Sequence, residues 1–356
     1  MRVLFLLRDL SPNGITTYNR TLARELVRQG HEVTVWPSLD GGHGGFPGAL
    51  LHPWCEPLLR ASVVRLRLEV LFVSHYTQAR LAQRLSQTLG IPWFACMHNG
   101  HSGRRMAQWA ELFRSASGIV TMCDTMHRLY VGEVSQGRDL PGGHVPPVLA
   151  SRLPLALPPL NARSTGKGPL TLAYCSRLSG HKGPRCEAWL RAIALIPGHQ
   201  ALHAMVIGGG SHLGRLRQVA RELGLDVEFT GMVADTGPCL QRVDVLAGAG
   251  YALMEGLVRG CSGVGLGFGG CWGAVTPSNL SEAVAVNFGD HCPYPLPEDP
   301  PSLAQALQDA MALVGTDGAT QVTSASRELF APQDIAKGVA RFWSQAVVPP
   351  AKSPFA

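Results

Sequence analysis

Two cations stand close together after a strand-like run in the second half of the chain. Residues 170–175 are mostly apolar, and Arg177 and Lys182 follow within the sequence Ser-Arg-Leu-Ser-Gly-His-Lys-Gly of residues 176–183. Open α/β sheets bind ligands at the carboxyl ends of their strands. A guanidinium and an ammonium at such a place could hold a diphosphate leaving group, whose negative charge grows as its bond breaks. The alternative is a pair of solvated loop cations.

A second candidate element follows the strand-like residues 243–246. Its sequence is Gly-Ala-Gly-Tyr-Ala-Leu-Met-Glu-Gly, residues 248–256. Small residues let backbone N–H groups at the start of a helix approach phosphate oxygens, which the helix N-terminus also attracts. The predicted ligand-binding residues here are Gly250, Tyr251, Ala252, Leu253 and Glu255. The Glu255 carboxylate would share a helix face with Tyr251 and could accept hydrogen bonds from ribose hydroxyls, or it could be an ordinary surface carboxylate.

The sequence also contains a literal Gly-x-Gly-x-x-Gly at Gly265, Gly267 and Gly270. A dinucleotide-binding fingerprint should follow a strand and open a helix. Here the sequence Cys-Trp-Gly of residues 271–273 follows, with no clear helix start. A nicotinamide-dependent oxidoreductase is therefore the weaker alternative.

Strand-like and helix-like runs alternate along the chain, as expected for parallel sheets covered by helices. Residues 2–7, a helix with Tyr18, Leu22 and Leu26 on one face, and residues 31–36 form a first βαβ unit. Further strands are expected at residues 70–74, 93–97, 118–123, 170–175, 203–207 and 227–230. The Gly/Pro-rich residues 41–53 are expected to form a loop.

A proline-rich stretch, residues 141–168, interrupts this alternation and is expected to contain no regular element. We therefore predict an N-terminal domain over residues 1–160 and a C-terminal domain over residues 161–331. The apolar side chains of Ile335, Val339, Phe342 and Trp343 share one helix face. They predict an amphipathic helix over residues 332–346 whose apolar face needs a surface to cover.

The composition is that of a globular protein with two domains. The chain has 356 residues, a formal net charge of +6 and 46% hydrophobic residues. No apolar run reaches the ~18 residues of a membrane span, and the apolar residues 2–7 are too short for a signal peptide. The nine cysteines show no CxxC spacing, and the positive charge is diffuse. We therefore expect a cytoplasmic protein that binds an anionic ligand rather than nucleic acid.

The order of these motifs resembles the retaining GT-B glycosyltransferases of the family 4 type, which include glycogen synthase, sucrose synthase and sugar transferases of bacterial envelopes. Residues 177–183 are similar to the family's GRL…KG signature, and Glu255 matches the second of its two glutamates. The resemblance implies two Rossmann-like, doubly wound domains facing a deep cleft. The first would bind the acceptor and the second the nucleotide sugar, with a C-terminal helix crossing back to the first.

The resemblance also implies roles for single residues. Arg177 and Lys182 would grip the diphosphate, and the bend at Gly209 would lie near the nucleotide base, although a tight turn explains that bend equally well. Gly14, in the first strand-to-helix loop, would let backbone amides reach the donor. His98, after the strand at residues 93–97, would contact the transferred sugar or the acceptor. His75 and His101 could join it as metal ligands, but the family needs no metal.

One departure from the family pattern bears on activity. The first of the two glutamates, eight positions before Glu255, is replaced by Ala247. In the family this glutamate lies near the transferred sugar. The sequence therefore predicts either an active transferase with an altered donor site or a degenerate protein that binds a nucleotide sugar without catalysis.

The expected reaction is transfer of a hexose from a UDP-, GDP- or ADP-sugar, with UDP first, to a glycan, a lipid-linked or a small-molecule acceptor. Retention of configuration is implied by the resemblance, and no cofactor is expected. Arg60, Arg65 and Arg67 alternate with apolar residues over residues 59–68. This stretch could rest on an anionic membrane surface at the inner membrane face, or it could be a core helix with a basic exposed side.

Overall fold

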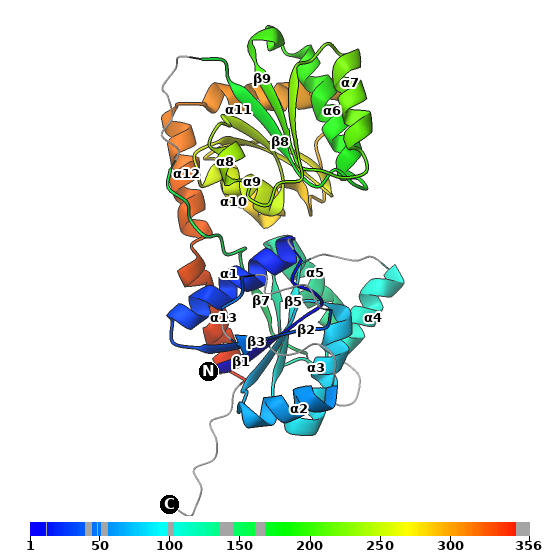
Figure 1. The fold of residues 1–356 in the computed structure, drawn as a ribbon, viewed down its shortest axis with the longest axis vertical. Coiled ribbons are helices and arrows are strands. Elements are labelled where there is room, and N and C mark those ends of the chain that lie inside the picture. Colours follow the sequence, from blue (N-terminus) through cyan, green and yellow to red (C-terminus); the bar gives the residue numbers. More distant parts are fainter. Residues whose placement is uncertain are drawn as a thin grey trace, which may run out of the picture. The chain divides into compact units, whose positions relative to one another are not determined.

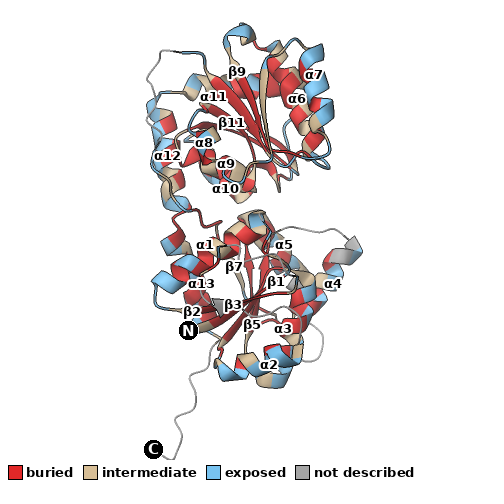
Figure 2. Cartoon of the chain, viewed as in Figure 1, coloured by how far each residue is buried: buried red, intermediate tan, exposed pale blue. Residues whose placement is uncertain are grey.

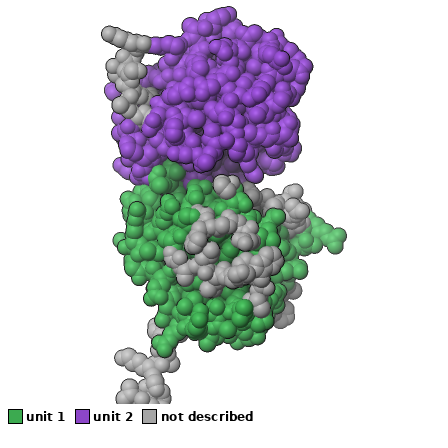
Figure 3. Space-filling model, in the orientation of Figure 1, with its two compact units in different colours: residues 1–156, 331–356 green, residues 157–330 purple. Residues whose placement is uncertain are grey.

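The computed structural model describes residues 1–11, 13–39, 45–47, 49–50, 56–98, 103–135, 145–160 and 168–346. The chain divides into two compact units (Figure 3): unit 1 is Met1–Ala156 with Ala331–Ala356, and unit 2 is Leu157–Phe330. The chain crosses from unit 1 to unit 2 inside the proline-rich stretch. It returns to unit 1 immediately before the amphipathic helix at the C-terminal end.

Unit 1 is built on a parallel sheet whose strands lie in the order β3-β2-β1-β4-β5-β6-β7 (Figure 1). Its strands are β1 (Arg2–Leu7), β2 (Glu32–Pro37), β3 (Ala49–Leu50), β4 (Val70–Val73), β5 (Trp93–Met97), β6 (Gly118–Thr121) and β7 (Val148–Ala150). Its helices are α1 (Gly14–Arg28), α2 (Glu56–Arg65), α3 (Tyr76–Leu89), α4 (Gly103–Phe113), α5 (Asp124–Ser135) and α13 (Pro332–Ser344). β1 lies between β2 and β4, so the sheet is wound in both directions from it.

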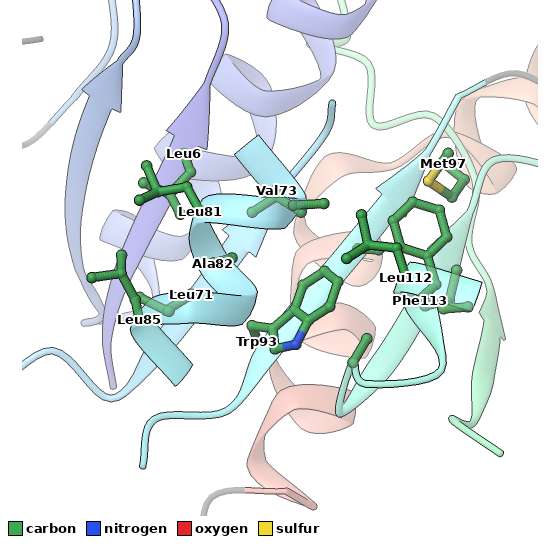
Figure 4. Packing of buried hydrophobic residues seen from close by; sticks show 14 of the residues in the cluster. Leu6, Leu71, Val73, Leu81, Ala82, Leu85, Trp93, Met97, Leu112 and Phe113 are labelled. Carbon is green, nitrogen blue, oxygen red and sulfur yellow. The ribbon is translucent and has the colours of Figure 1, made fainter. Parts of the chain in front are cut away.

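The strands β1, β2, β4, β5 and β6 of unit 1 are buried on both faces (Figure 2). On one face the side chains of Leu6, Leu71 and Trp93 pack against α3 and α4, as Figure 4 shows. The Trp93 indole also donates a hydrogen bond to the Ser115 carbonyl at 2.8 Å, which satisfies its buried N–H. Burial on both faces explains why the sequences of these strands are continuous apolar runs and do not alternate between apolar and polar residues.

Two strands of unit 1 were not predicted from the sequence. β3 lies within the expected loop of residues 41–53 and pairs with β2, although much of that segment lies outside the described residues. β7 lies within the proline-rich stretch and pairs with β6, so the prediction of no regular element there was wrong. Both strands are short and lie at the edges of the sheet, where partners far along the chain supply the pairing that local sequence does not reveal.

The C-terminal helix α13 covers the other face of the unit 1 sheet, beside α1. The Trp343 ring lies 4.9 Å from Phe72 and 6.3 Å from Phe5, centroid to centroid. The Phe342 ring lies 5.5 Å from Phe94 and touches the space above Gly118, where an added Cβ would come within 2.6 Å of it. The predicted crossing helix is confirmed, and its apolar stripe completes the core of unit 1.

Val339 on this stripe provides a test of that packing. Its side chain is 1% exposed, and its truncation in Val339→Ala removes two methyl groups from the core. We expect unit 1 to lose about 2 kcal/mol of unfolding free energy. The exposed Arg341 on the same helix is the matched control, because Arg341→Ala should change stability by less than about 0.5 kcal/mol. Equal effects in urea unfolding would contradict the packing described here.

Unit 2 is built on a second sheet with the strand order β10-β9-β8-β11-β12-β13, in which only β13 is antiparallel. Its strands are β8 (Thr171–Cys175), β9 (His203–Ile207), β10 (Val227–Gly231), β11 (Val245–Gly248), β12 (Ser262–Gly267) and β13 (Gly270–Val275). Its α-helices are α6 (Lys182–Leu195), α7 (Leu213–Glu222), α8 (Gly237–Leu240), α9 (Gly250–Leu257), α10 (Leu280–Ala285), α11 (Pro300–Leu313) and α12 (Asp317–Leu329). Two short 3₁₀ segments, η1 (His199–Ala201) and η2 (Asn287–Gly289), complete it.

The order of the strands in unit 2 creates a switch point between β8 and β11. From β8 the chain continues to β9 and β10 on one side, and it then returns to place β11 on the other side of β8. The segments that follow β8 and β11 therefore leave the sheet in opposite directions from adjacent strands. Ligands of open α/β sheets bind in the crevice that this divergence opens.

Candidate functional site

The segment that carries Arg177 is held in place by its backbone. The Ser176 N–H donates to the Ile207 carbonyl at 3.1 Å, and the Leu178 N–H donates to the Gly209 carbonyl at 2.9 Å. The Leu178 side chain is completely buried, whereas Arg177 is exposed. The loop is thus anchored on both sides of Arg177, and the guanidinium is left at the surface beside the switch point.

Lys182 is the first residue of α6, at the far end of the same loop. Its carbonyl accepts a hydrogen bond from the buried Tyr174 hydroxyl of β8 at 3.1 Å, which ties the start of α6 to the strand. The Lys182 side chain is half-buried. Both cations predicted to hold the diphosphate therefore follow the carboxyl end of β8.

Neither cation is neutralised by another described residue. Three nearby arginines of α6 and α7 are paired with carboxylates: Arg185 with Glu298 at 3.0 Å, Arg191 with Glu187 at 2.8 Å and Arg215 with Glu187 at 3.3 Å. Arg177 and Lys182 form no ion pair or side-chain hydrogen bond with any described residue. Their charges remain available to an anionic ligand.

The glycines at residues 208–210 form the surface on which this loop rests. A Cβ at Gly208 would lie 1.9 Å from the Ser176 carbonyl oxygen, and one at Gly210 would lie 2.5 Å from the Ser179 hydroxyl. Both glycines have a positive φ, +135° and +152°. These glycines therefore do more than form a tight turn. They let the backbone after β9 pack directly against the loop that carries Arg177. A contact of Gly209 with a nucleotide base stays a prediction.

The helix α9 begins on the other side of the switch point, directly after β11. Its N-cap residue is Ala249, which has no side chain able to cap the first N–H groups of the helix. Gly250, the first helical residue, has a φ of +54°, and Tyr251 and Ala252 are half-buried. The Leu253 side chain is completely buried in the core, so only its backbone could contact a ligand.

Glu255 lies one turn further along α9 in a largely enclosed position. Its carboxylate accepts a hydrogen bond from the Thr236 hydroxyl at 2.6 Å. Burial raises the pKa of this carboxyl, while the Thr236 hydrogen bond and the charge of Arg259 act in the opposite direction. The enclosure argues against a solvated helix-surface carboxylate.

The buried thiol of Cys175, the last residue of β8, lies within the electrostatic influence of both Lys182 and Glu255. Burial raises its pKa to about 12, with the negative charge of Glu255 adding to the rise and the positive charge of Lys182 opposing it. Both charges therefore act on the same end of the same strand. The structure brings together Lys182 and Glu255, which the sequence separates by the whole of two βα units.

Glu255 provides a prediction with a defined pH dependence. A carboxyl whose pKa is raised on folding contributes stability below its unfolded pKa and loses that contribution as pH rises through the folded value. Glu255→Gln should therefore flatten the fall in stability above about pH 4.5 and leave the protein at least as stable at pH 7. The prediction from the sequence that Glu255 accepts hydrogen bonds from ribose hydroxyls implies in addition that Glu255→Gln weakens UDP binding by about 10-fold. Thermal unfolding against pH and calorimetry measure the two effects, and a variant that is less stable at pH 7 would contradict this account.

Ala247, which replaces the first glutamate of the family pattern, lies inside β11. Its side chain is completely buried, and its register partners are Tyr174 of β8 and Val264 of β12. It belongs to the apolar core of unit 2. The position is therefore filled by packing rather than by a polar side chain directed at a ligand.

The Gly-x-Gly-x-x-Gly sequence lies in a β-hairpin formed by β12 and β13. A Cβ at Gly267 would lie 2.3 Å from the Asp290 backbone nitrogen, and one at Gly265 would lie 2.9 Å from the Phe288 carbonyl oxygen. The glycines thus allow the backbone of residues 288–290 to approach the hairpin. The strand-to-helix arrangement of a dinucleotide fingerprint is absent from these described residues.

This close approach brings two side chains to α9 that were not predicted from the sequence. The Asp290 carboxylate accepts hydrogen bonds from the Phe268 N–H at 2.8 Å and from the Asn287 amide at 3.3 Å. One of its oxygens lies 3.3 Å from the position of a Cβ at Gly250. Asn287 and Asp290 therefore border the first residue of α9. In the sequence, the glycines at residues 265, 267 and 270 were the signal that another segment of backbone approaches the hairpin.

In unit 1 the predicted residues also follow the carboxyl ends of strands. Gly14 is the exposed first residue of α1, after β1, and the preceding Asn13 caps the helix by accepting a hydrogen bond from the Thr16 N–H at 3.0 Å. His98 follows β5, and its Nε2 lies 3.4 Å from the Cys96 sulfur. Burial, together with the neighbouring His75, lowers the pKa of His98 to about 3. The ring is therefore neutral at working pH.

Two further sequence interpretations concern metals and membranes. His101 lies outside the described residues, and the described part of the chain holds no group of three or more His, Cys, Asp or Glu side chains placed to bind a metal ion. Within the same part, no helix is both long and apolar enough to span a bilayer.

Comparison with known proteins relates the chain to others by its fold. No family model matches the sequence, and no curated protein matches it either. Among solved structures, HepE of Anabaena in complex with UDP and glucose matches with a TM-score of 0.69 and 16% identity, over 97% of this chain and 100% of that one. A glycosyltransferase from Rickettsia africae matches with a TM-score of 0.72 and 12% identity, over 98% and 99% of the two chains.

Sucrose-phosphate synthase from Thermosynechococcus elongatus matches with a TM-score of 0.68 and 15% identity, over 97% of this chain and 98% of that one. These likenesses extend over both units, and each unit carries a doubly wound sheet with its candidate residues after the carboxyl ends of the strands. Together with the helix that returns to unit 1, they establish that the chain has the GT-B fold.

Proposed function

We propose that this protein is a metal-independent, retaining glycosyltransferase that moves a hexose from a nucleotide-diphosphate sugar to a glycan, lipid-linked or small-molecule acceptor. The observation that carries the proposal is the placement of Arg177 and Lys182, two cations with no ion-pair partner among the described residues, after β8 and of the start of α9 after β11. These two elements flank the switch point of unit 2, where a sheet of this kind binds its ligand.

The chemistry of the leaving group matches these elements. As the glycosidic bond breaks, negative charge develops on the diphosphate, and fixed cations and backbone N–H groups stabilise it without reorganising. The ammonium of Lys182 and the guanidinium of Arg177 supply two such charges, and the start of α9 supplies N–H groups. No protein nucleophile is needed for this step. A same-face mechanism, in which the leaving phosphate accepts the acceptor's proton, is what the family resemblance implies and accounts for retention.

We infer that UDP is the first nucleotide to test and that the enclosed Glu255 binds its ribose. HepE, which shares the fold, has been crystallised with UDP, with UDP and glucose, and with UDP-glucose. The Glu255 carboxylate can accept hydrogen bonds from ribose hydroxyls in addition to the one from Thr236. Gly14 and His98 of unit 1 are proposed to contact the sugar or acceptor.

Thermal unfolding in the presence of UDP, GDP, ADP and their sugars tests the proposal directly. A ligand that binds only the folded state stabilises it by RT ln(1 + [L]/Kd), so the matching nucleotide should raise the melting temperature in a concentration-dependent manner. Release of free UDP from UDP-sugars, with and without acceptors, then measures turnover. Absence of any nucleotide-dependent shift over the whole panel would refute a nucleotide-sugar site.

The burial of Ala247 favours one alternative, a protein that binds a nucleotide sugar but does not transfer it. Ala247 is buried and carries no carboxylate. The contact that the first glutamate of the family pattern would make near the transferred sugar is therefore missing here. This alternative predicts a clear thermal shift with UDP but neither transfer nor slow hydrolysis of any UDP-sugar tested. Measurable transfer would exclude it.

We further propose that α2 contacts anionic membranes. Leu59 and Val63 are buried, but Leu58 and Val64 are 66% and 61% exposed on a helix that also exposes Arg60. Exposed apolar side chains beside cations suit the boundary of an anionic leaflet. We expect the chain to sediment with vesicles that contain anionic lipid, and Leu58→Glu with Val64→Glu to weaken this binding by about 5-fold or more. Leu195→Glu, at an exposed leucine of α6, is the control and should have no effect; equal losses would argue against a role for α2.

A further inference from the structure

A buried polar cluster, consisting of Tyr18, Asn19, Ser74, Cys96 and His98, lies at one end of the unit 1 sheet. Its members come from α1 and from the carboxyl ends of β4 and β5. Tyr18, Asn19 and Cys96 are completely buried, and Ser74 is 5% exposed. His98 alone keeps part of its surface open. The cluster is therefore arranged behind the imidazole, on the side away from solvent.

The contacts within the cluster converge on Cys96 and His98. The Cys96 sulfur lies 3.4 Å from His98 Nε2, and the Tyr18 ring packs edge-on against the imidazole at 5.0 Å between centroids. The Asn19 amide donates to the Ser74 hydroxyl at 2.9 Å, which fixes the side chain of Ser74. The Ser74 hydroxyl in turn donates to the Asn19 side-chain oxygen at 3.2 Å. The position and ring plane of His98 are thus set by side chains that cannot themselves reach solvent.

The chemistry of the two central groups decides which one donates. Burial raises the pKa of the Cys96 thiol far above neutral pH, so the sulfur keeps its proton. The imidazole is neutral, because burial lowers its pKa, and one of its nitrogens must carry a lone pair. Sulfur is a weak acceptor and an imidazole nitrogen is a strong one. The S–H group therefore donates to Nε2.

A lone pair on Nε2 has a consequence for the other nitrogen. A neutral imidazole carries a single proton, and which nitrogen bears it is set by the hydrogen bond that the other one makes. With Nε2 accepting from the thiol, Nδ1 must bear the proton. His98 then offers an N–H donor and has no free lone pair with which to act as a base.

We propose that Cys96 is a positioning residue that fixes His98 in its neutral Nδ1–H tautomer, so that His98 serves as a hydrogen-bond donor to a sugar oxygen and not as a general base. The identification of that oxygen as part of a sugar rests on the proposed function. The tautomer itself does not, because the cluster determines it in the absence of any ligand.

Nuclear magnetic resonance of the full-length protein labelled with ¹⁵N-histidine tests the tautomer directly. Long-range proton–nitrogen correlations distinguish a protonated ring nitrogen from one with a lone pair, and His98→Asn assigns the signals. We expect Nδ1 protonated and Nε2 unprotonated throughout the range from about pH 6 to 8. A protonated Nε2 in the wild-type protein would overturn the proposal without the need for any variant.

Two substitutions of Cys96 separate positioning from mere packing. Cys96→Ser keeps an O–H donor and should retain the Nδ1–H tautomer, whereas Cys96→Val fills similar space without a donor and should lose it. We expect kcat/KM for transfer to fall by about 10-fold in Cys96→Val, through kcat rather than KM, and by less than about 3-fold in Cys96→Ser. Loss in Cys96→Ser equal to that in Cys96→Val would overturn the role of the thiol proton.

The two readouts keep this proposal distinct from the proposed function. If no nucleotide sugar supports transfer by the wild-type protein, the enzymatic proposal fails, while the tautomer measurement still decides the role of Cys96. If Cys96→Val unfolds, as shown by its thermal melt, the spectra of the wild type and of Cys96→Ser remain sufficient. A wild-type spectrum that shows both tautomers in equal amounts would contradict the fixed donor.

Discussion

Replacing Arg177 by alanine is expected to lower kcat/KM for glycosyl transfer by about 10²–10³-fold, and Lys182→Ala should do the same. Both side chains are expected to act on charge that develops in the transition state, so kcat should fall more than KM rises. Donor hydrolysis in the absence of acceptor should decrease in parallel, because the same leaving group departs in both reactions. Steady-state kinetics with the donor found in the thermal screen provides the measurement.

The fold should survive these substitutions, which makes the experiment decisive. Arg177 is exposed and Lys182 half-buried, and neither forms an ion pair or side-chain hydrogen bond within the described chain. Their removal should therefore change the melting temperature of the free protein little, while abolishing most of the stabilisation by UDP. Arg221→Ala on α7, at an exposed arginine away from the switch point, is the matched control. Near-normal turnover of both site variants would exclude the proposed role.

The second large effect is expected from Gly208→Ala. The added Cβ would lie 1.9 Å from the Ser176 carbonyl oxygen and 3.0 Å from its carbon, at a residue whose φ is +135°. Steric overlap with backbone cannot be relieved by a rotamer change, and the backbone conformation is itself unfavourable for alanine. We expect a loss of about 3 kcal/mol or more in the stability of unit 2.

This substitution should also affect ligand binding, because the carbonyl that must move belongs to the residue before Arg177. Any folded Gly208→Ala protein should bind UDP at least about 10-fold more weakly than the wild type. Gly214→Ala is the control: no atom lies within 4 Å of its added Cβ, and the residue is part of α7. It should stabilise unit 2 by about 0.5 kcal/mol. Denaturant unfolding and calorimetry would refute the supporting role of Gly208 if the two variants behaved alike.

Much of the fold follows from local pattern. Apolar runs such as β1 and β5, buried on both faces, and the helical spacing of Tyr18, Leu22 and Leu26 were sufficient to predict a chain of alternating strands and helices. The two short edge strands, β3 and β7, were missed, because their pairing depends on β2 and β6 rather than on their own composition. The amphipathic stripe of α13 predicted a covered surface, and the family resemblance predicted which one.

Some residues of the candidate site could likewise be predicted from local sequence, and others could not. Arg177, Lys182 and Glu255 stand in local motifs after strands, and so they could be found without coordinates. Asn287 and Asp290 could not, because the segment that carries them reaches α9 only through the glycines of the β12–β13 hairpin. The reason for those glycines, close backbone approach, is a relation between distant residues.

By itself, the sequence determined most of the segments that form strands and helices and the short motifs that carry charge, because hydrophobic periodicity and side-chain chemistry are local properties. Only the tertiary structure decided which glycine supports the loop of Arg177, that Ala247 is a core residue, and that the thiol of Cys96 faces the imidazole of His98. The first two features depend on contacts between strands that neighbour each other in a sheet but not in the chain, and the third depends on α1, whose Tyr18 packs against His98. The burial that such contacts create is also what keeps His98 neutral and encloses Glu255.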